Sequence, residues 1–138
     1  MKISIRDGSN YFKGLLLLIR KDRKIKESEI QLMKHIGKAL GFESEFCENA
    51  IHEVLENKFI IDNTPEFSNK ELAVMFIKDG LAIANSDTEI HLAEEEWLRS
   101  TAENNGLDLN WFQSERTIAE NRHHLPSKME VDNLKVDY

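Results

Sequence analysis

The sequence predicts an all-α domain in which a single helical unit is used twice. Apolar residues recur at spacings of three and four along most of the chain, as they do on one face of a helix. Only two prolines and six glycines occur among the 138 residues, so long helices are permitted. A gapless shift of 65 positions lays the segment from Tyr11 to Phe46 on the segment from Phe76 to Trp111. We therefore expect six or seven helices in a compact bundle made of two copies of a three-helix unit.

The first unit is expected at about residues 8–57. Apolar stripes predict helices over residues 8–20, 27–40 and 44–57. Gly41 is placed to end the second of them, because glycine adopts the left-handed conformation that commonly closes a helix.

The second unit is expected at about residues 69–121. A serine followed three residues later by a glutamate has the spacing of a capping box, which opens a helix. The connector before it, residues 59–67, is broken by polar residues and a proline, so we expect only a short extended stretch there. The expected helices and their signals are 69–85 opened by Ser68 and Glu71, 92–105 ended by Gly106, and 111–121 capped by Asn110.

We assign residues 1–121 to one domain and residues 122–138 to a C-terminal tail. A chain of this length can bury a sizeable core without disulfides or metals. The tail has one proline and no clear apolar period, so we expect it to drape on the surface or to move.

The positions that match between the two copies are those that shape turns and helix ends. Each copy has an aspartate in its loop, an isoleucine three residues later, a glutamate at the start of the next helix and a glycine at that helix's end. These shared positions predict the same loop and turn geometry in both copies. The matched pairs are Asp22 and Asp87, Ile25 and Ile90, Glu29 and Glu94, and Gly41 and Gly106.

Composition argues against several classes of function. The net charge of −7 disfavours non-specific binding of nucleic acid, whose phosphates attract clustered Lys and Arg. The longest apolar run, from Leu15 to Ile19, is far shorter than the ~20 residues of a membrane span, so no direct membrane insertion is expected. The first residues contain no apolar signal-peptide core, and Cys47 is the single cysteine. A cytoplasmic location is therefore expected.

Few side chains suggest chemistry by themselves. His35 and His52 lie on predicted helices with no cysteine or second histidine at ligand spacing. The sequence has no Gly-rich phosphate loop, no Gly-x-Ser-x-Gly elbow and no His-Glu-x-x-His motif. Four of the large aromatic residues are singled out as expected members of the core: Phe42, Phe46, Trp97 and Trp111.

The loop of the second copy is the candidate site. Asp87, Glu89 and Glu94 could converge there with backbone carbonyls, and oxygen ligands of this kind bind calcium or magnesium. The alternative is structural. In that case Glu94 caps the start of the helix that follows His91, and Asp87 organises the turn. Ile90 packs into the core, as Ile25 does in the first loop.

The two loops differ in the sign of their charge. Clusters of like charge are either solvated faces or a surface for a partner, which would be a charged protein or a second copy of this chain. The first loop is basic, with Arg20, Lys21, Arg23, Lys24 and Lys26, and the second is acidic, with Asp87, Glu89, Glu94, Glu95 and Glu96.

The two loops and the helices after them resemble the paired motifs of the TerB-like family. The motifs are Asp22-Arg-Lys-Ile25-Lys-Glu-Ser-Glu29 through Gly41 and Asp87-Thr-Glu-Ile90-His-Leu-Ala-Glu94 through Gly106. The resemblance covers about residues 11–112. It implies an all-helical, internally duplicated fold and metal binding by the loop acids. Arg23 and Thr88 stand where family members typically carry glycine, and the first loop is basic, which disfavours metal binding by the first unit.

We therefore expect a non-enzymatic TerB-like binding module whose partner is another protein or a second copy of itself. A divalent cation, calcium or magnesium, at Asp87, Glu89 and Glu94 is a candidate ligand, and the resemblance implies a stress or tellurite-resistance system. One alternative is a small metal-dependent enzyme that uses the same acidic cluster, with His91 as the nearby candidate base. Another is a purely structural helical module of a larger assembly.

Overall fold

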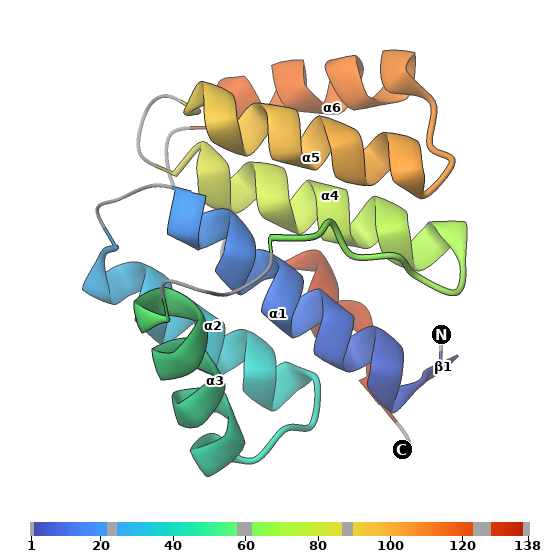
Figure 1. The fold of residues 1–138 in the computed structure, drawn as a ribbon. Helices are drawn as coiled ribbons and strands as arrows, with labels where there is room; N and C mark the ends of the chain where they lie inside the picture. The colour runs from blue at the N-terminus through green and yellow to red at the C-terminus, as the bar shows by residue number, and fades with distance from the viewer. Residues whose placement is uncertain (1, 22–24, 58–61, 87–89, 123–127, 137–138) are drawn as a thin grey trace.

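The computed structural model describes residues 2–21, 25–57, 62–86, 90–122 and 128–136. These residues form a helical bundle, so the predicted all-α fold class is confirmed (Figure 1). The elements in chain order are β1 (Lys2–Ile3), α1 (Ile5–Lys21), α2 (Glu27–Ala39), α3 (Ser44–Glu56), α4 (Lys70–Ala84), α5 (Leu92–Asn104), α6 (Leu109–Glu120), the 3-10 helix η1 (Glu130–Asn133) and β2 (Lys135–Val136).

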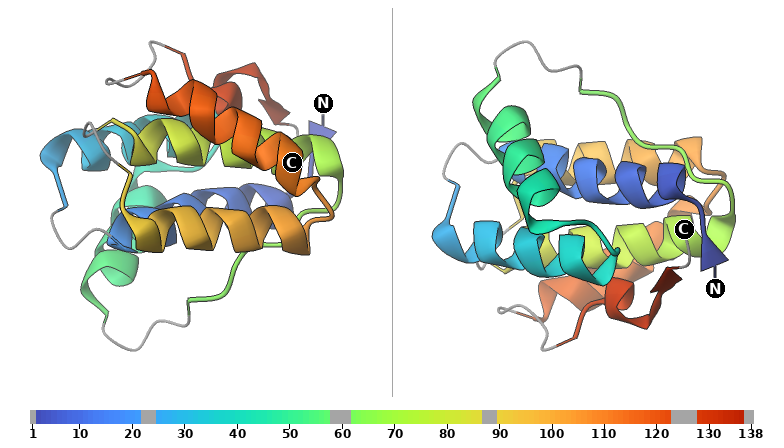
Figure 2. Two further views of the ribbon diagram at one scale, coloured as in Figure 1. Left: turned by 90° about the horizontal axis from the view of Figure 1, so that it is seen from above. Right: turned by 90° about the horizontal axis from the view of Figure 1, so that it is seen from below.

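The helices α1 and α4 lie side by side in the middle of the molecule (Figures 1 and 2). Helix α1 packs against α2 and α3, whereas α4 packs against α5 and α6. The two copies of the unit meet through α1, which contacts both α4 and α5. In Figure 1 the α2–α3 pair and the α5–α6 pair therefore lie at opposite ends of the row of helices.

The 65-residue repeat of the sequence is present in the structure. Helices α2 and α5 begin at Glu27 and Leu92, and α3 and α6 begin at Ser44 and Leu109, so both pairs are 65 residues apart. The turns between them also agree, because Gly41 and Gly106 have φ angles of 80° and 74°. That left-handed conformation strains any residue with a side chain, which explains a glycine in both copies.

The starts of α1, α4 and α6 differ from the sequence prediction. Helix α1 begins at Ile5 rather than near residue 8, and the Oγ of Ser4 accepts the amide of Asp7 at 3.1 Å. Helix α4 is capped by Asn69, whose Oδ1 accepts the amide of Leu72 at 2.8 Å. The predicted Ser68 capping box is therefore wrong.

The cap of α6 is also displaced from the predicted one. Asp108 caps this helix, because its Oδ1 accepts the amide of Asn110 at 2.7 Å. Asn110 lies inside the first turn instead of capping it. An aspartate two residues earlier in the chain makes the stronger interaction with the positive end of the helix.

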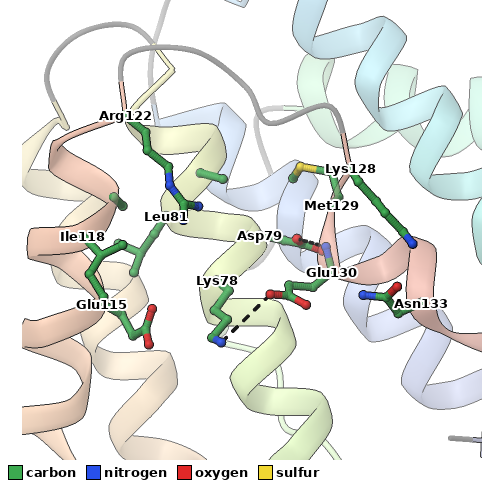
Figure 3. A pocket seen from close by; sticks show the side chains of 12 residues that line it. Lys78, Asp79, Leu81, Glu115, Ile118, Arg122, Lys128, Met129, Glu130 and Asn133 are labelled. Atoms are coloured by element: carbon green, nitrogen blue, oxygen red, sulfur yellow. Dashed lines mark hydrogen bonds and ion pairs between the residues drawn. The ribbon is translucent and has the colours of Figure 1, made fainter.

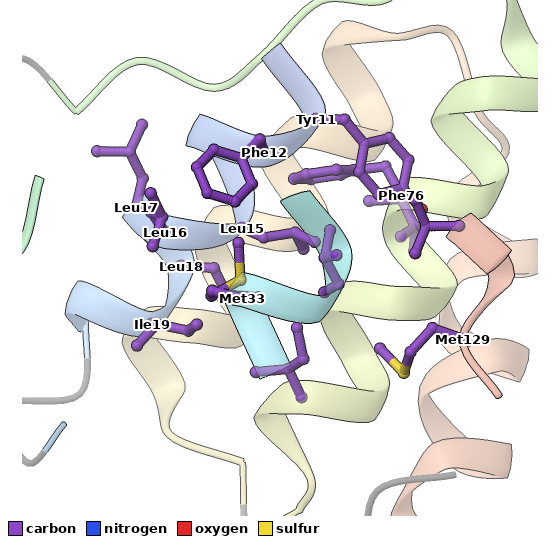
Figure 4. Packing of buried hydrophobic residues seen from close by; sticks show 14 of the residues in the cluster. Tyr11, Phe12, Leu15, Leu16, Leu17, Leu18, Ile19, Met33, Phe76 and Met129 are labelled. Carbon is purple, nitrogen blue, oxygen red and sulfur yellow. The ribbon is translucent and has the colours of Figure 1, made fainter. Parts of the chain in front are cut away.

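The core is centred on α1, which explains the longest apolar run of the sequence. A helix that is surrounded on all sides by protein carries apolar residues all round. Figure 4 shows this run from α1 packing with Met33 of α2, Phe76 of α4 and Met129 of the C-terminal segment. Every residue from Leu15 to Ile19 is buried. Among the described residues, no helix is long and apolar enough to cross a membrane.

The C-terminal segment, which we define as residues 128–136, packs into the core rather than draping on the surface. Its Met129, Val131 and Leu134 are buried, and β2 pairs in parallel with β1, Lys2 opposite Lys135. The 3-10 helix η1 contacts α4 of the second unit and α2 of the first. The segment therefore bridges the two copies. The remainder of the predicted tail beyond Arg122, residues 123–127 and 137–138, lies outside the described residues.

Candidate functional site

The structure describes only one of the three predicted cation ligands. Asp87 and Glu89 lie outside the described residues. Glu94 is buried at the third position of α5, after the N-cap His91. Its counterpart Glu29 is also buried at the third position of α2, where its Oε1 accepts the amide of Lys26 at 3.0 Å. The position of Glu94 therefore agrees with the structural alternative, and the cation site stays a prediction.

Several charged and aromatic residues singled out in the sequence have surroundings that differ from the prediction. In the basic loop Arg23 and Lys24 lie outside the described residues. In the acidic cluster, Glu95 forms ion pairs with Arg99 and Arg116, so its carboxylate already has partners within the chain. Phe46 was expected in the core, but 41% of its surface is exposed, and that expectation is wrong.

The other core expectations also had mixed outcomes. Trp97 is buried, whereas Phe42 and Trp111 are only partly buried against the core. Ile90 packs partly buried against the core, but Ile25 is 37% exposed and does not plug the first loop. The first copy therefore exposes apolar side chains at its loop and on α3 that the sequence pattern assigned to the core.

A groove runs between α2 and α3, and we call it the α2–α3 groove. It consists of two adjoining hollows of about 500 Å³ and about 250 Å³, and Lys34 lines both. The larger lies at the turn end and the smaller at the open end of this antiparallel helix pair. The larger hollow is lined by Gln31, Lys34, His35, Lys38, Phe42, Ser44 and Cys47, and the smaller by Ile30, Lys34, Glu48, Ile51, His52, Leu55 and Glu56.

The floor of the α2–α3 groove is formed where the two helices approach most closely. A Cβ on Gly37 would lie 2.3 Å from the Sγ of Cys47, so only glycine permits this approach. Burial raises the pKa of the Cys47 thiol, with a smaller contribution from Glu48, and a thiol that stays protonated is a poor nucleophile. Cys47 therefore serves packing. Beside it Phe42 lines the larger hollow, and its ring lies 5.0 Å from that of Phe46, which lines neither hollow.

The two edges of the groove carry opposite charge. Lys34 and Lys38 are exposed on α2, whereas Glu48 and Glu56 are exposed on α3. Glu56 lies 3.1 Å from the Nε2 of His52. Within the part of the chain that the structure describes, Lys34, Lys38 and Glu48 form no ion pair. The groove therefore has an apolar floor between a basic edge and an acidic edge.

The equivalent space in the second unit is filled by charged side chains. The 65-residue shift places Glu95, Arg116 and Glu120 where the groove has Ile30, Ile51 and Leu55. Arg116 Nε lies 2.5 Å from Glu95 Oε1, although without hydrogen-bond geometry, and Arg116 Nη1 donates to Glu120 at 3.2 Å.

The remaining equivalent positions of the second unit are closed in the same way. Arg99, which corresponds to Lys34, lies over the ring of Phe112 with its Cζ 5.9 Å from the ring centroid. Phe112 itself corresponds to Cys47 and fills the floor. We call this closed counterpart the α5–α6 face. The same backbone arrangement is thus open and apolar in one copy and sealed in the other.

A further cavity of about 250 Å³ lies between α4, α6 and the C-terminal segment (Figure 3). Asp79 is buried at its base. Its carboxylate accepts hydrogen bonds from the Tyr11 hydroxyl at 2.6 Å and from the amides of Glu130 at 2.7 Å and Val131 at 3.1 Å. Asp79 therefore fastens the C-terminal segment to α1 and α4.

Burial decides the titration of this carboxyl. It raises the pKa of Asp79 to about 6, although the hydrogen bonds from Tyr11, Glu130 and Val131 act in the opposite direction. Burial and the neighbouring Asp79 also raise the pKa of the Tyr11 hydroxyl. Sequence reasoning missed Asp79. The available signal was an acidic residue directly between the apolar positions Phe76, Ile77 and Leu81 of α4.

Comparisons with known proteins add no relative. A scan against protein-family models, a search of curated proteins and a search of solved structures each find no match to this chain. The resemblance to the TerB-like family therefore stays a prediction.

Proposed function

We propose that this chain is a non-catalytic protein-binding module of TerB-like architecture and that the α2–α3 groove is its binding face. One observation carries the proposal. At equivalent positions the α5–α6 face is closed by Arg116 and its two glutamates, whereas the α2–α3 groove is lined by apolar residues, of which Ile30 and Leu55 are partly exposed.

The composition of the groove is that of a protein interface. Interfaces combine an apolar, aromatic centre with a polar rim, and most of the binding energy comes from a few central side chains. Phe42 supplies aromatic surface here, and the charged side chains of both helices supply the rim. Fully burying one phenylalanine contributes roughly 1.5–3 kcal/mol, so Phe42 is the expected anchor.

The buried carboxylates support a non-catalytic assignment because they stabilise the backbone. Asp79 accepts two amides of the C-terminal segment, Glu29 accepts an amide at the start of α2, and Asp7 accepts the amide of Ser68 at 3.1 Å. Each of these groups satisfies donors that would otherwise be unpaired. The resemblance would place such a module in a stress or tellurite-resistance system.

The binding face is tested by titrating isotope-labelled protein with amphipathic helical peptides of acidic, basic and neutral character. We expect amide shifts confined to α2 and α3 for at least one class. Phe42→Ser should weaken that binding about 10-fold or more, which corresponds to about 1.4 kcal/mol. Leu107→Ser is the matched control, because Leu107 is the equivalent of Phe42 in the second copy and is also partly buried against the core. Circular dichroism checks that both variants are folded. Shifts that map to α5–α6, or binding that a folded Phe42→Ser leaves unchanged, would contradict the proposal.

The predicted cation site needs its own experiment. Oxygen ligands from Asp87, Glu89 and Glu94 would make the melting temperature rise with calcium or magnesium, because a ligand that binds the folded state stabilises it. Glu89→Gln should abolish the rise. The same variant separates the enzyme alternative, since any manganese- or magnesium-dependent activity of that cluster should disappear with it. A melting temperature that neither ion changes would contradict the predicted cation site.

A further inference from the structure

We propose that the partner of the α2–α3 groove is a second copy of this chain, with α2 of each copy lying on α3 of the other. This inference rests on the proposed function and specifies its partner. It is carried by the separation of charge across the groove, with lysines on one edge and glutamates on the other.

A two-fold axis relates the surfaces of a closed homodimer, so each copy contributes the same face. Two directions of this axis within the plane of the face lay the helices of the two copies directly on each other. An axis that runs along the groove lays α2 on the partner's α3, and therefore basic edge on acidic edge. An axis across the groove lays α2 on α2 and would place like charges together. Only the first arrangement is electrostatically favourable.

The position of Lys34 defines the register of the pairing. Lys34 lines both hollows, and Glu48 lies across the smaller hollow from it on α3. An axis along the groove keeps the height of each residue, so Lys34 of one copy faces Glu48 of the other, and the pair occurs twice. Neither side chain has an ion-pair partner within the described part of its own chain, so both are available.

The size of the face predicts a weak, reversible dimer. Helices α2 and α3 each have 13 residues, which gives a length of about 20 Å, and two packed helices are about 20 Å wide. A face of this size is near the lower limit of specific interfaces. We expect a dissociation constant on the order of 10–100 µM, since small interfaces without many hot spots bind weakly.

The test uses charge reversal and sedimentation equilibrium over protein concentrations from about 10 µM to about 1 mM, a range set by that affinity. Lys34→Glu and Glu48→Lys should each weaken self-association about 10-fold or more, because each creates two like-charge pairs per dimer. An equimolar mixture of the two variants should associate again. In the mixed dimer the introduced glutamate faces the introduced lysine, and the unchanged Lys34 of one copy faces the unchanged Glu48 of the other. Both cross-copy pairs then have opposite charge.

Two comparisons make the result decisive. Glu103→Lys, an equal charge change at an exposed position of α5, should leave association unchanged. Circular dichroism should show that every variant is folded, because the two groove positions are exposed. A chain that stays monomeric up to about 1 mM overturns the self-association inference but not the proposed function, which the peptide titration decides. Reversal variants that associate like the wild type, or a mixture that stays monomeric, overturn the inferred register.

Discussion

Between α2 and α3 the smaller hollow is lined by Ile30, Ile51 and Leu55, whereas between α5 and α6 the equivalent positions hold Glu95, Arg116 and Glu120. The helices start in the same register and the turn glycines have nearly the same φ angle. The backbone of the repeat therefore depends on few positions, and the side chains between the helices are free to differ. One copy closes its own helix pair with charged side chains, and the other leaves a groove with an apolar lining.

A second difference concerns the central helices. The 65-residue shift matches Gly14 of α1 with Asp79 of α4. A Cβ on Gly14 would lie 2.8 Å from the ring of Phe76, so this position serves close packing of α1 on α4. Asp79 instead fastens the C-terminal segment. At this position the first copy allows α1 and α4 to pack closely, and the second copy holds the C-terminal segment in place.

The largest effect is expected from removing that anchorage. Asp79→Ala leaves the Tyr11 hydroxyl and the amides of Glu130 and Val131 without their acceptor. Unpaired buried donors cost about 1–3 kcal/mol each, so we expect a loss of at least about 3 kcal/mol in the free energy of unfolding. Urea unfolding followed by circular dichroism measures it. A loss below about 1 kcal/mol would show that the segment is held by apolar contacts alone.

The pH dependence of stability should also depend on Asp79 of α4, whereas its counterpart in α1, Gly14, has no side chain that titrates. The folded-state pKa of Asp79, about 6, is above its ordinary value of 3.8, so the folded protein binds this proton more tightly than the unfolded one. Its contribution is fully present below the unfolded-state pKa and is lost as the pH rises through about 6. We expect the unfolding free energy of the wild type minus that of Asp79→Asn to be about 2 kcal/mol larger at about pH 4.5 than at about pH 7.5. A difference of the opposite sign would mean that hydrogen bonding outweighs burial.

Gly37 tests why the two helix pairs pack differently. Its equivalent in the second copy is Ala102, which shows that the other helix pair accommodates a Cβ there. In the first copy Gly37→Ala would collide with the Sγ of Cys47. Overpacking of this kind costs about 1–3 kcal/mol, measured as a lower urea midpoint. Adding Cys47→Ala should recover part of the loss, and a double variant no better than Gly37→Ala would refute this explanation.

The smallest effect is expected at the ion pairs that close the α5–α6 face. Arg116→Ala removes both glutamate contacts of a partly exposed side chain. Partly exposed pairs contribute about 1 kcal/mol or less, and less still at high salt. Thermal unfolding at low and high salt measures this. An effect independent of salt would indicate that the arginine acts through packing.

Local signals in the sequence were sufficient for the helices and for the repeat. The apolar spacing located α1 to α6 to within a few residues, and Gly41 and Gly106 end α2 and α5 as expected. The cap of α4 was misplaced by one residue because Ser68 and Asn69 are both good caps. A contact between distant segments decides between them, because Ser68 donates hydrogen bonds to the carboxylate of Asp7 in α1.

Other features depend on contacts between segments that are far apart in the sequence. Residues 128–136 have no helical period, and their burial results from pairing with β1 and from Asp79. Phe46 has the helical spacing of a core residue, yet the rings of Phe12 and Phe42 beside it cover it only in part, and 41% of its surface is exposed. The open groove was visible in the sequence only as a comparison of aligned positions, for example Ile51 against Arg116, once the helix pairs were known to pack alike.

The most direct test is a dilution series of the wild-type protein followed by backbone amide chemical shifts. If a second copy covers the α2–α3 groove, the amides of α2 and α3 should shift between about 10 µM and about 1 mM, while those of α5 and α6 stay constant. Concentration-dependent shifts on α5 and α6, or none on α2 and α3, would contradict the account.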